Sequence, residues 1–357
     1  MSLFDIIIIN KIVFMENIEL KFETVANSIK IPEIADKKTS KRYISWGNDN
    51  KFPNYLFDSY LKCSDLQALV NQLVDYIAGD EIKYTYKYRS DDGEYLEEVI
   101  KKCIFDYILF GGFALEGIRS ANKDIVRLNY INVMHVRVDE DLTTAFLSNQ
   151  WGSFNGKNII ELPLFNSNEQ QDHFIFYYRG KVTRNINPIP IYSGALKSIE
   201  ILNNIRDFHL NNLNNGFSSA ALINLNDGNI KTRELKEIKE RIENKFCGTK
   251  NAGKFILLNG GDKEHEASIV KLDANNFGEQ YYALQDSSKD DLFVAFRMNP
   301  ILVGVNVETG FSKEEFENAY ALYYATVVKP IQNEMIKCFN KLGVKIDFTP
   351  FKINWSE

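Results

Sequence analysis

The sequence predicts an α+β protein, and three observations carry that prediction. The first half holds short apolar runs that alternate with polar residues and end at turn formers, as β-strands do. The second half holds long segments in which apolar residues recur every three or four positions, as in amphipathic helices. Apolar residues make up 45% of the 357 residues and charged residues 25%, the composition of a folded protein with a large core.

In the first half, residues 53–78 are expected to form two helices, with Ser64 as the N-cap of the second and Gly79 as its stop. A strand is expected at 81–88 and a helix at 94–109. Six further strand-like runs lie between turn residues: "FALEGI", "IVRLNYI", "MHVRVDE", "TTAFLS", "HFIFYYR" and "IPIY".

The second half is expected to be built mainly from long helices. Ser312 and Glu315 form a capping box for the last helix, Pro330 is expected to kink it, and Gly343 is its C-terminal cap. The expected helices cover residues 193–213, 232–246, 278–298 and 312–342, and the expected strands are "AALINL", "KFILLNGG" and "KIDFTPFKI".

The N-terminal stretch "MSLFDIIIINKIVF" is apolar but interrupted by Asp5, Asn10 and Lys11. It is too short and too polar for a membrane span, which needs about 20 mostly apolar residues. It also lacks the basic region and the cleavage site of a signal peptide. We expect a strand here, or residues upstream of a natural start at Met15, and no contact with a membrane.

The charge balance disfavours a protein that grips nucleic acid. The chain has 42 Lys and Arg residues against 48 Asp and Glu, a formal net charge of −6. Proteins that hold DNA or RNA usually carry a basic excess, because contacts to phosphates dominate their affinity. This chain has no such excess overall.

Residues with metal-binding or catalytic potential form no recognisable constellation. The four cysteines are far apart without a C-x-x-C pair and there are four histidines, so we expect reduced thiols, no metal and no cofactor. The pairs Asp91-Asp92 and Asp290-Asp291 fit metal ligands or a solvated face, and a solvated face is the commoner case. Three histidines are assigned to a strand, a helix and a turn, where a core or surface role is commoner than catalysis: His135, His209 and His265.

The turn "GTKNAGKF", from Gly248 to Phe255, is one residue away from the phosphate-binding pattern G-x-x-x-x-G-K-[ST]. Phe255 cannot supply the hydroxyl that this pattern gives to Mg²⁺. The order of elements is also reversed, because a P-loop follows a strand and opens a helix, whereas here a helix precedes the turn and a strand follows it. The pattern therefore favours a plain Gly/Asn-rich turn over a nucleotide site.

Several segments, in order, resemble the bacteriophage portal (head–tail connector) family. In the second half they are "YSGALKSIEILNNIRDFHLNNLNNGF", "GTKNAGKFILLNGG", "LFVAFRMNPILVGV" and "ETGFSKEEFENAYALYYATVVKPIQNEMIKCFN". In the first half, "WGNDNKFPNYLFDSYLKCS", "GGFALEGI" and "LNYINVMHVRV" resemble portals of phages and prophages of Bacteroidetes-type hosts. The resemblance covers about residues 43–345, and Asn299-Pro300 stands where the family usually has Pro-Pro.

The resemblance implies a portal-type α+β fold with little or no C-terminal crown. Its expected parts are an α/β wing (1–190), a stem helix (191–215), a small α/β clip (216–273), a second stem helix (274–298), a channel or tunnel loop (299–311), a long proline-kinked helix (312–343) and a C-terminal strand (344–357).

The resemblance also implies a structural virion protein rather than an enzyme. Its subunits form a ring, commonly of twelve, at one capsid vertex, and double-stranded DNA passes through the ring during packaging and ejection. Implied partners are further copies of the chain, the terminase motor, the major capsid protein and head–tail connector proteins. The protein is expected in the host cytoplasm during assembly and afterwards in the virion.

Two groups of residues follow from this layout as candidate contacts. The channel loop would present five residues to DNA: Asn299, Pro300, Asn306, Glu308 and Thr309. The clip would present four residues to the terminase or a connector: Gly248, Lys250, Asn251 and Lys254. Two alternatives stay open: an atypical nucleotide-binding enzyme that uses the turn 248–255, and a DNA-gripping module that uses the Lys and Arg residues of 231–245, although these alternate with Glu.

Overall fold

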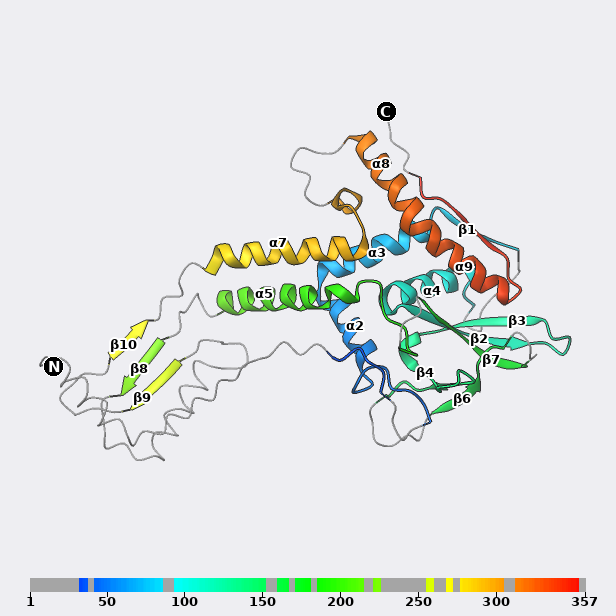
Figure 1. The fold of residues 1–357 in the computed structure, drawn as a ribbon, viewed down its shortest axis with the longest axis horizontal. Coiled ribbons are helices and arrows are strands. Elements are labelled where there is room, and N and C mark those ends of the chain that lie inside the picture. The colour runs from blue at the N-terminus through cyan, green and yellow to red at the C-terminus, as the bar shows by residue number, and fades with distance from the viewer. Residues whose placement is uncertain are drawn as a thin grey trace, which may run out of the picture. The chain divides into compact units, whose positions relative to one another are not determined.

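The structure is a computed structural model, drawn in Figure 1. It describes residues 32–37, 42–85, 93–151, 159–166, 171–180, 185–214, 221–225, 255–259, 268–271, 277–304 and 312–352. All of them belong to the unit of residues 31–357. The expected N-terminal strand and Met15, the helix 232–246, the turn 248–254, Asp91-Asp92 and His265 lie outside the described residues.

The first helices agree with the sequence except at one cap. They are α2 (Phe52–Lys62), α3 (Ser64–Ala78) and α4 (Leu96–Phe110). The prediction that Ser64 is the N-cap is wrong by one residue, because Cys63 is extended (φ −97°, ψ 103°) and Ser64 already lies in the helix. Gly79 ends α3 as predicted, with φ +66°, and a Cβ at this position would lie 2.0 Å from the Thr349 carbonyl oxygen.

The strands of the first half form two antiparallel three-stranded sheets. One has the order β3-β2-β7 and the other the order β4-β5-β6. The six strands are β2 (Gly112–Arg119), β3 (Ile125–Ile131), β4 (Val136–Val138), β5 (Thr144–Leu147), β6 (Ile160–Pro163) and β7 (His173–Arg179).

Three predictions in this region are corrected. "IPIY" is not a strand, because Ile191 and Tyr192 form a turn that leads into the short 3₁₀ helix η2 (Ser193–Ala195). His135 does not lie in a strand but ends the 3₁₀ helix η1 (Val133–His135), which Asn132 caps by accepting a hydrogen bond from the Met134 N–H. Strand β6 was not predicted, because its four residues alternate too briefly to give a pattern.

A fully buried arginine ties the segment before α2 to β4. Arg137 donates to the Asn50 side chain (Nε to Oδ1, 2.5 Å) and to the Asn50 carbonyl (3.1 Å), and its guanidinium carbon lies 5.3 Å and 4.8 Å from the rings of Trp46 and Trp151. Burial lowers the pKa of Arg137 to about 9, against the raising effect of Tyr177, Tyr43 and Asp36. It remains charged at neutral pH and holds Asn50 in a left-handed turn (φ 62°).

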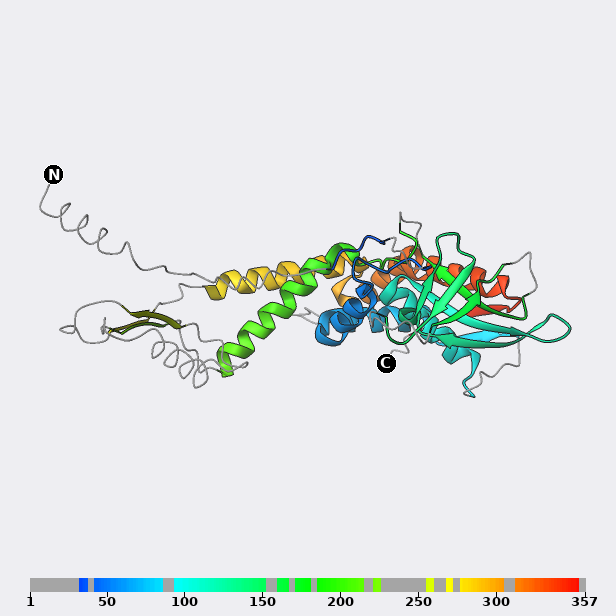
Figure 2. The same cartoon turned by 90° about the horizontal axis from the view of Figure 1, so that it is seen from below.

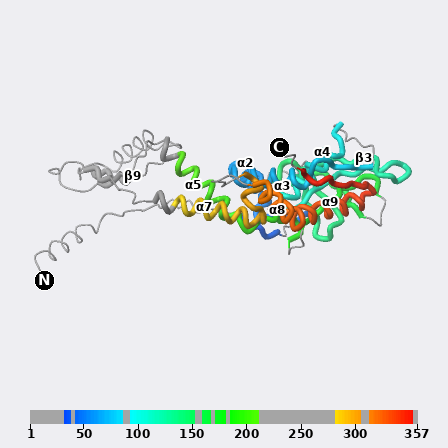
Figure 3. Tube along the Cα trace, turned by 90° about the horizontal axis from the view of Figure 1, so that it is seen from above, coloured from blue at the N-terminus to red at the C-terminus, as the bar shows by residue number. Residues whose placement is uncertain are grey.

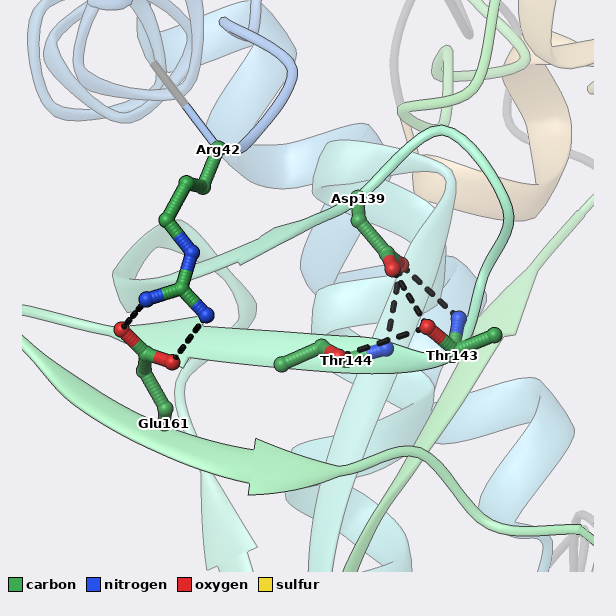
Figure 4. A network of polar contacts seen from close by, with 5 residues as sticks. All are labelled: Arg42, Asp139, Thr143, Thr144 and Glu161. Carbon is green, nitrogen blue, oxygen red and sulfur yellow. Dashed lines mark hydrogen bonds and ion pairs between the residues drawn. The ribbon is translucent and has the colours of Figure 1, made fainter.

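The same segment is also fixed at the surface. Figure 4 shows Arg42 forming a bidentate pair with Glu161 of β6, at 2.8 and 2.7 Å. In the same view Asp139 accepts hydrogen bonds from the backbone N–H groups of Thr143 (2.8 Å) and Thr144 (3.0 Å), which sets the turn between β4 and β5.

Two long helices follow, and they pack side by side in antiparallel directions. They are α5 (Leu196–Asn214) and α7 (Phe277–Phe296). The Ser198 hydroxyl of α5 donates to Asp291 of α7 (2.7 Å), and ten residues further along, Phe208 lies 5.0 Å from Tyr281. Figure 2 shows the two helices together near α2 and α3 and separating towards Asn214 and Phe277.

Three strands of the second half form a mixed sheet of order β10-β8-β9. They are β8 (Ala221–Leu225), β9 (Phe255–Asn259) and β10 (Ser268–Lys271). β8 pairs parallel with β9 and antiparallel with β10. The prediction of strands at "AALINL" and "KFILLNGG" is confirmed, and Phe255 begins β9.

The last helix is interrupted where the sequence predicted a kink. α8 (Lys313–Tyr323) passes through the π-helical turn η4 (Tyr324–Val328) into α9 (Lys329–Lys341). Pro330 lacks the N–H that an α-helix would use to reach residue 326, and a wider turn accommodates this. Two hydrogen bonds close α9 at Gly343, from Val344 N to Phe339 O and from Gly343 N to Asn340 O, which is a Schellman motif.

The C-terminal strand β11 (Ile346–Thr349) pairs antiparallel with β1 (Glu81–Tyr84), far earlier in the chain. Helix α4 lies at the centre of the core, and Phe339 of α9 stacks on Phe113 of β2. Each fully buried Ile or Leu in such a core contributes about 1.5–3 kcal/mol. The buried apolar residues of α4 are Leu96, Val99, Ile100, Cys103, Ile104, Tyr107, Ile108, Leu109 and Phe110.

Candidate functional site

Of the nine candidate contact residues, the structure describes two, Asn299 and Pro300. The other seven lie outside the described residues: Asn306, Glu308, Thr309, Gly248, Lys250, Asn251 and Lys254. The candidate site that can be built is therefore the place where α7 ends, the short 3₁₀ helix η3 (Pro300–Val303) follows, and α8 begins.

α7 ends earlier than the sequence predicted. The expected end was residue 298, but Arg297 takes a left-handed conformation (φ 54°) and stops the helix at Phe296. The Arg297 N–H then bonds to the Val294 carbonyl (3.0 Å) and the Met298 N–H to the Phe293 carbonyl (3.0 Å). The Phe296 ring is fully buried and stacks on Tyr192, with ring centroids 5.3 Å apart.

The segment expected to be a loop begins with a helical turn. The Asn299 side chain accepts from the Ile301 N–H (3.0 Å), and its carbonyl accepts from the Leu302 N–H (2.9 Å). Pro300 occupies the first helical position, where its missing N–H costs nothing. Gly304, with φ 72°, ends the turn. Asn299 and Pro300 thus act as a cap, and the expectation of a loop from residue 299 is corrected to one that begins no earlier than Gly304.

Two tyrosines hold this turn and the end of α7. Tyr76 of α3 is 1% exposed, and its hydroxyl donates to the Leu302 carbonyl at 2.8 Å. Tyr323 of α8 donates to the Phe296 carbonyl at 3.3 Å. Burial, with a smaller effect of Asp75, raises the pKa of Tyr76 to about 12, so its hydroxyl stays protonated at neutral pH. Both contacts therefore persist as neutral hydrogen bonds.

α8 begins at the capping box that the sequence predicted. The Glu315 N–H donates to the Ser312 hydroxyl (3.1 Å), and the Ser312 N–H donates to the Glu315 carboxylate (2.9 Å). Glu314 and Glu315 lie in the first turn, where the positive end of the helix dipole stabilises negative charge.

Helix α7 carries exposed acidic side chains. Asp286 and Asp290 lie one turn apart and are exposed, while Asp291 accepts the Ser198 hydroxyl. Within the ranges that the structure describes, no three His, Cys, Asp or Glu residues are grouped as metal ligands.

Large apolar side chains also remain exposed on the helix pair. Val294 is the most exposed, at 75%, and Leu322 of α8 is 68% exposed. The others on α5 and α7 are Phe208, Leu210, Tyr282 and Leu284. Exposed apolar groups that gather on one part of a molecule usually mark a contact surface.

The sequence did not single out the residues that organise this site. Tyr76 and Tyr323 lie within the helices expected at 53–78 and 312–342, and no capping or turn signal marks either of them. A tyrosine in a buried stripe signals that its hydroxyl needs a partner, although the sequence does not say which one.

No helix in the described part of the chain has the length and apolar character needed to cross a bilayer.

Comparison with protein families matches residues 83–356 to the family described as "Phage portal protein". The chain belongs to this family, which confirms the resemblance found in the sequence. The family is structural, in agreement with the expectation that the protein is not an enzyme.

The relatives among curated proteins are uncharacterized proteins of two Rickettsia species. The protein of Rickettsia felis (strain ATCC VR-1525 / URRWXCal2) is 26% identical over 240 residues, 65% of this chain and 57% of the relative. That of Rickettsia bellii (strain RML369-C) is 27% identical over 111 residues, 31% of this chain and 27% of the relative. The chain therefore spans only part of the length of each, and neither supports the Bacteroidetes-type host implied earlier.

Solved structures share the fold at low sequence identity. A chain in the neck of a native GTA (gene transfer agent) particle, computed with C12 symmetry, aligns with a TM-score of 0.55 and 14% identity, and the alignment covers 83% of both chains. An HK97 family phage portal protein from Corynebacterium diphtheriae aligns with a TM-score of 0.52 and 10% identity, covering 82% of this chain and 94% of that one. The α+β architecture is thus that of portal proteins.

Proposed function

We propose that this protein is the portal subunit of a phage or phage-like particle and forms a ring at one capsid vertex. DNA is packaged and ejected through the ring. The observation that carries the proposal is the family match over residues 83–356, which spans α4, the sheets, both long helices and the interrupted last helix. The protein works in the host cytoplasm during assembly and in the neck of the finished particle.

The described elements can be assigned to the parts of a portal. The helices and sheets up to residue 190 form the wing, α5 and α7 are the two stem helices, and the β10-β8-β9 sheet belongs to the clip. Within the segment 299–311, η3 leads into the channel loop. Residues 312–343 form the kinked helix, and β11 lies in the C-terminal segment 344–357. The clip docks the terminase motor and head–tail connector proteins through Gly248, Lys250, Asn251 and Lys254, and the wing faces the major capsid protein.

A ring that conducts DNA should not hold it. The exposed Asp286 and Asp290 on α7 support this role, because a ring of carboxylates repels phosphates and lets the duplex slide. Asn306, Glu308 and Thr309 face DNA at the channel loop, while Asn299 and Pro300 hold the helical turn that precedes them.

The exposed apolar side chains of α5 and α7 support a lateral contact between subunits. Leu210 is 56% and Tyr282 65% exposed in the single chain. Burying apolar area contributes about 25 cal/mol per Å², so a ring in which neighbouring helix pairs meet would remove these side chains from water at a gain in free energy. The ring, commonly of twelve subunits, is then the state in which these helices are fully packed.

The test is electron microscopy of the purified protein, combined with its mass in solution. Annular particles with a central hole, or rings formed on concentration, are the expected result. A protein that stays monomeric at all concentrations and also fails to form rings with its capsid protein would contradict the proposal. The channel loop has its own test: removing Val305–Glu308 should leave rings intact but lower the DNA content of assembled heads.

A further inference from the structure

The last turn of α3 holds two distant parts of the chain through adjacent residues. The Tyr76 hydroxyl donates to the Leu302 carbonyl of η3, 226 residues away, at 2.8 Å. The carbonyl of the next residue, Ile77, accepts from Nε2 of Gln332 in α9, 255 residues away, at 2.8 Å. Both contacts are buried. One turn of helix therefore fixes both the segment before residue 305 and the helix after the π-turn.

Gln332 is itself tied to the π-turn. Its side chain is 3% exposed, and its Oε1 accepts from the hydroxyl of Tyr324, the first residue of η4, at 3.3 Å. The two ends of one amide are thus used at once, since the oxygen faces the π-turn and the nitrogen faces α3. A carboxylate of the same size has no N–H to donate to the Ile77 carbonyl, so only the amide satisfies both neighbours.

Tyr323, the residue before Tyr324, contacts the end of α7. Tyr323 donates to the Phe296 carbonyl at the end of α7, and its ring centroid lies 6.2 Å from that of Tyr76. Tyr76 also packs against Tyr320 (5.1 Å) and Phe351 (5.4 Å). The π-turn, α3, η3 and the end of α7 are therefore joined by one set of neutral side-chain contacts. Figure 3 shows the course of the backbone here, with α8 and α9 running past α3.

We propose that the last turn of α3 couples the π-turn to η3. Tyr76 holds η3 in position through its hydrogen bond to Leu302. A rearrangement at Tyr324–Val328 would move Gln332, which contacts the Ile77 carbonyl, and so change the position of Tyr76 and of η3. This rests on the proposed function, in which η3 leads into the channel loop. A π-turn is one residue wider than an α-turn, so its conversion to α-helix shifts the register of everything after it. Gln332 would then leave the Ile77 carbonyl, and a buried carbonyl that loses its donor is destabilising.

The test is hydrogen–deuterium exchange of the full chain, measured on the amides of Ile301, Leu302 and Gly304, which donate the hydrogen bonds of η3. Tyr76→Phe removes the direct contact and should speed exchange there about fivefold, the effect of about 1 kcal/mol. Gln332→Glu, which does not touch η3, should speed the same amides in the same direction. Tyr178→Phe is the matched control, since it removes a 3.2 Å bond to Glu334 of the same helix α9 and should leave η3 unchanged.

Each outcome decides one part of the proposal. Unchanged exchange in Tyr76→Phe overturns the positioning role of Tyr76, and unchanged exchange in Gln332→Glu overturns the coupling. A general loss of structure would also speed the amides of β2, which therefore serve as an internal reference in every variant. The exchange measurement needs neither rings nor DNA, so it tests the coupling even if the protein forms no rings. If rings form, DNA retention by rings of Tyr76→Phe tests the link between η3 and the channel.

Discussion

Two regions differ in how far they bury their apolar side chains: the strand-rich region around α4 and the pair of helices α5 and α7. In the first region Phe113, Leu115 and Phe174 are fully buried, and the buried Arg137 donates hydrogen bonds to Asn50 and to backbone carbonyls. In the second, Val294 is 75% and Tyr282 65% exposed. The first region forms a buried core within one chain, although Ile160 of β6 is 62% exposed. In the ring proposed above, the exposed side chains of α5 and α7 would be buried between subunits. Mutations should therefore affect folding in the first region and association in the second.

The largest expected effect is on folding, at Arg137. Arg137→Met removes the buried donor to the carbonyls of Asn50, Met134 and Val136 and leaves the Asn50 side-chain oxygen with the Trp46 N–H alone. We expect a loss of about 3 kcal/mol in the free energy of unfolding, measured by urea denaturation. The control is Arg42→Met, which breaks an exposed pair with Glu161 and should cost at most about 1 kcal/mol. Equal losses in the two variants would remove the distinction between the buried and the exposed arginine.

The second effect should fall on association alone. Val294→Asp places a charge on the exposed part of α7, and we expect the free energy of unfolding of the monomer to change by less than about 0.5 kcal/mol. Ring formation, followed by light scattering and electron microscopy, should be lost. Ile160→Asp, at a 62% exposed position of β6, should leave rings intact. Rings that form normally with Val294→Asp would show that this part of α7 lies outside the subunit contact.

A third, smaller effect concerns the pH dependence of the strand-rich core. Asp106 is fully buried, and burial raises its pKa from 3.8 to about 7, against hydrogen bonds from the Val133 N–H and the Tyr130 hydroxyl that lower it. The unfolded chain loses this proton near pH 4 and the folded chain only near pH 7. Asp106 therefore makes the protein less stable as pH rises from about 4 to about 7, with no further change above.

Asp106→Asn should flatten that part of the stability curve, as followed by thermal unfolding at a series of pH values. Asp139 affects the pH dependence of stability in the opposite direction, and Asp139→Asn should remove that effect. Partial burial of Asp139 would raise its pKa, but hydrogen bonds from Thr143 and Thr144 outweigh burial and lower it. Its contribution is present above the unfolded pKa and is lost as pH falls through the folded one. Identical slopes for wild type and Asp106→Asn between pH 4 and 7 would refute the assignment.

The last prediction is that a substitution in the turn 248–255 has no effect on nucleotide binding. Lys254→Ala in the turn 248–255 should leave ATP binding and hydrolysis unchanged from wild type, because we expect neither activity. Calorimetry with Mg²⁺-ATP and a phosphate-release assay are the measurements. Saturable binding by wild type that Lys254→Ala abolishes would restore the nucleotide-site alternative.

Local patterns predicted local structure well. The capping box at Ser312 and Glu315, the stop at Gly79 and the break around Pro330 all follow from one or two residues acting on their own backbone. The family was also readable from the order of its segments. What the sequence could not supply were contacts across large separations, such as Tyr76 with Leu302, because nothing near either residue specifies the other. Other errors had local causes: β6 is too short to give a pattern, and Asn299-Pro300, expected to open a loop, caps and begins a helical turn instead.

The pairing of β1 with β11 has a consequence for the order of events during synthesis. Glu81–Tyr84 pair with Ile346–Thr349, so β1 is synthesised long before its partner strand. More than half of the chain must still be translated before the two strands can pair. At roughly 5–20 residues per second the wait is on the order of tens of seconds. Throughout that time β1 presents an open strand edge on a nascent chain, the kind of edge that recruits foreign strands. Unpaired β1 is therefore an aggregation hazard for the nascent chain until Thr349 has been made.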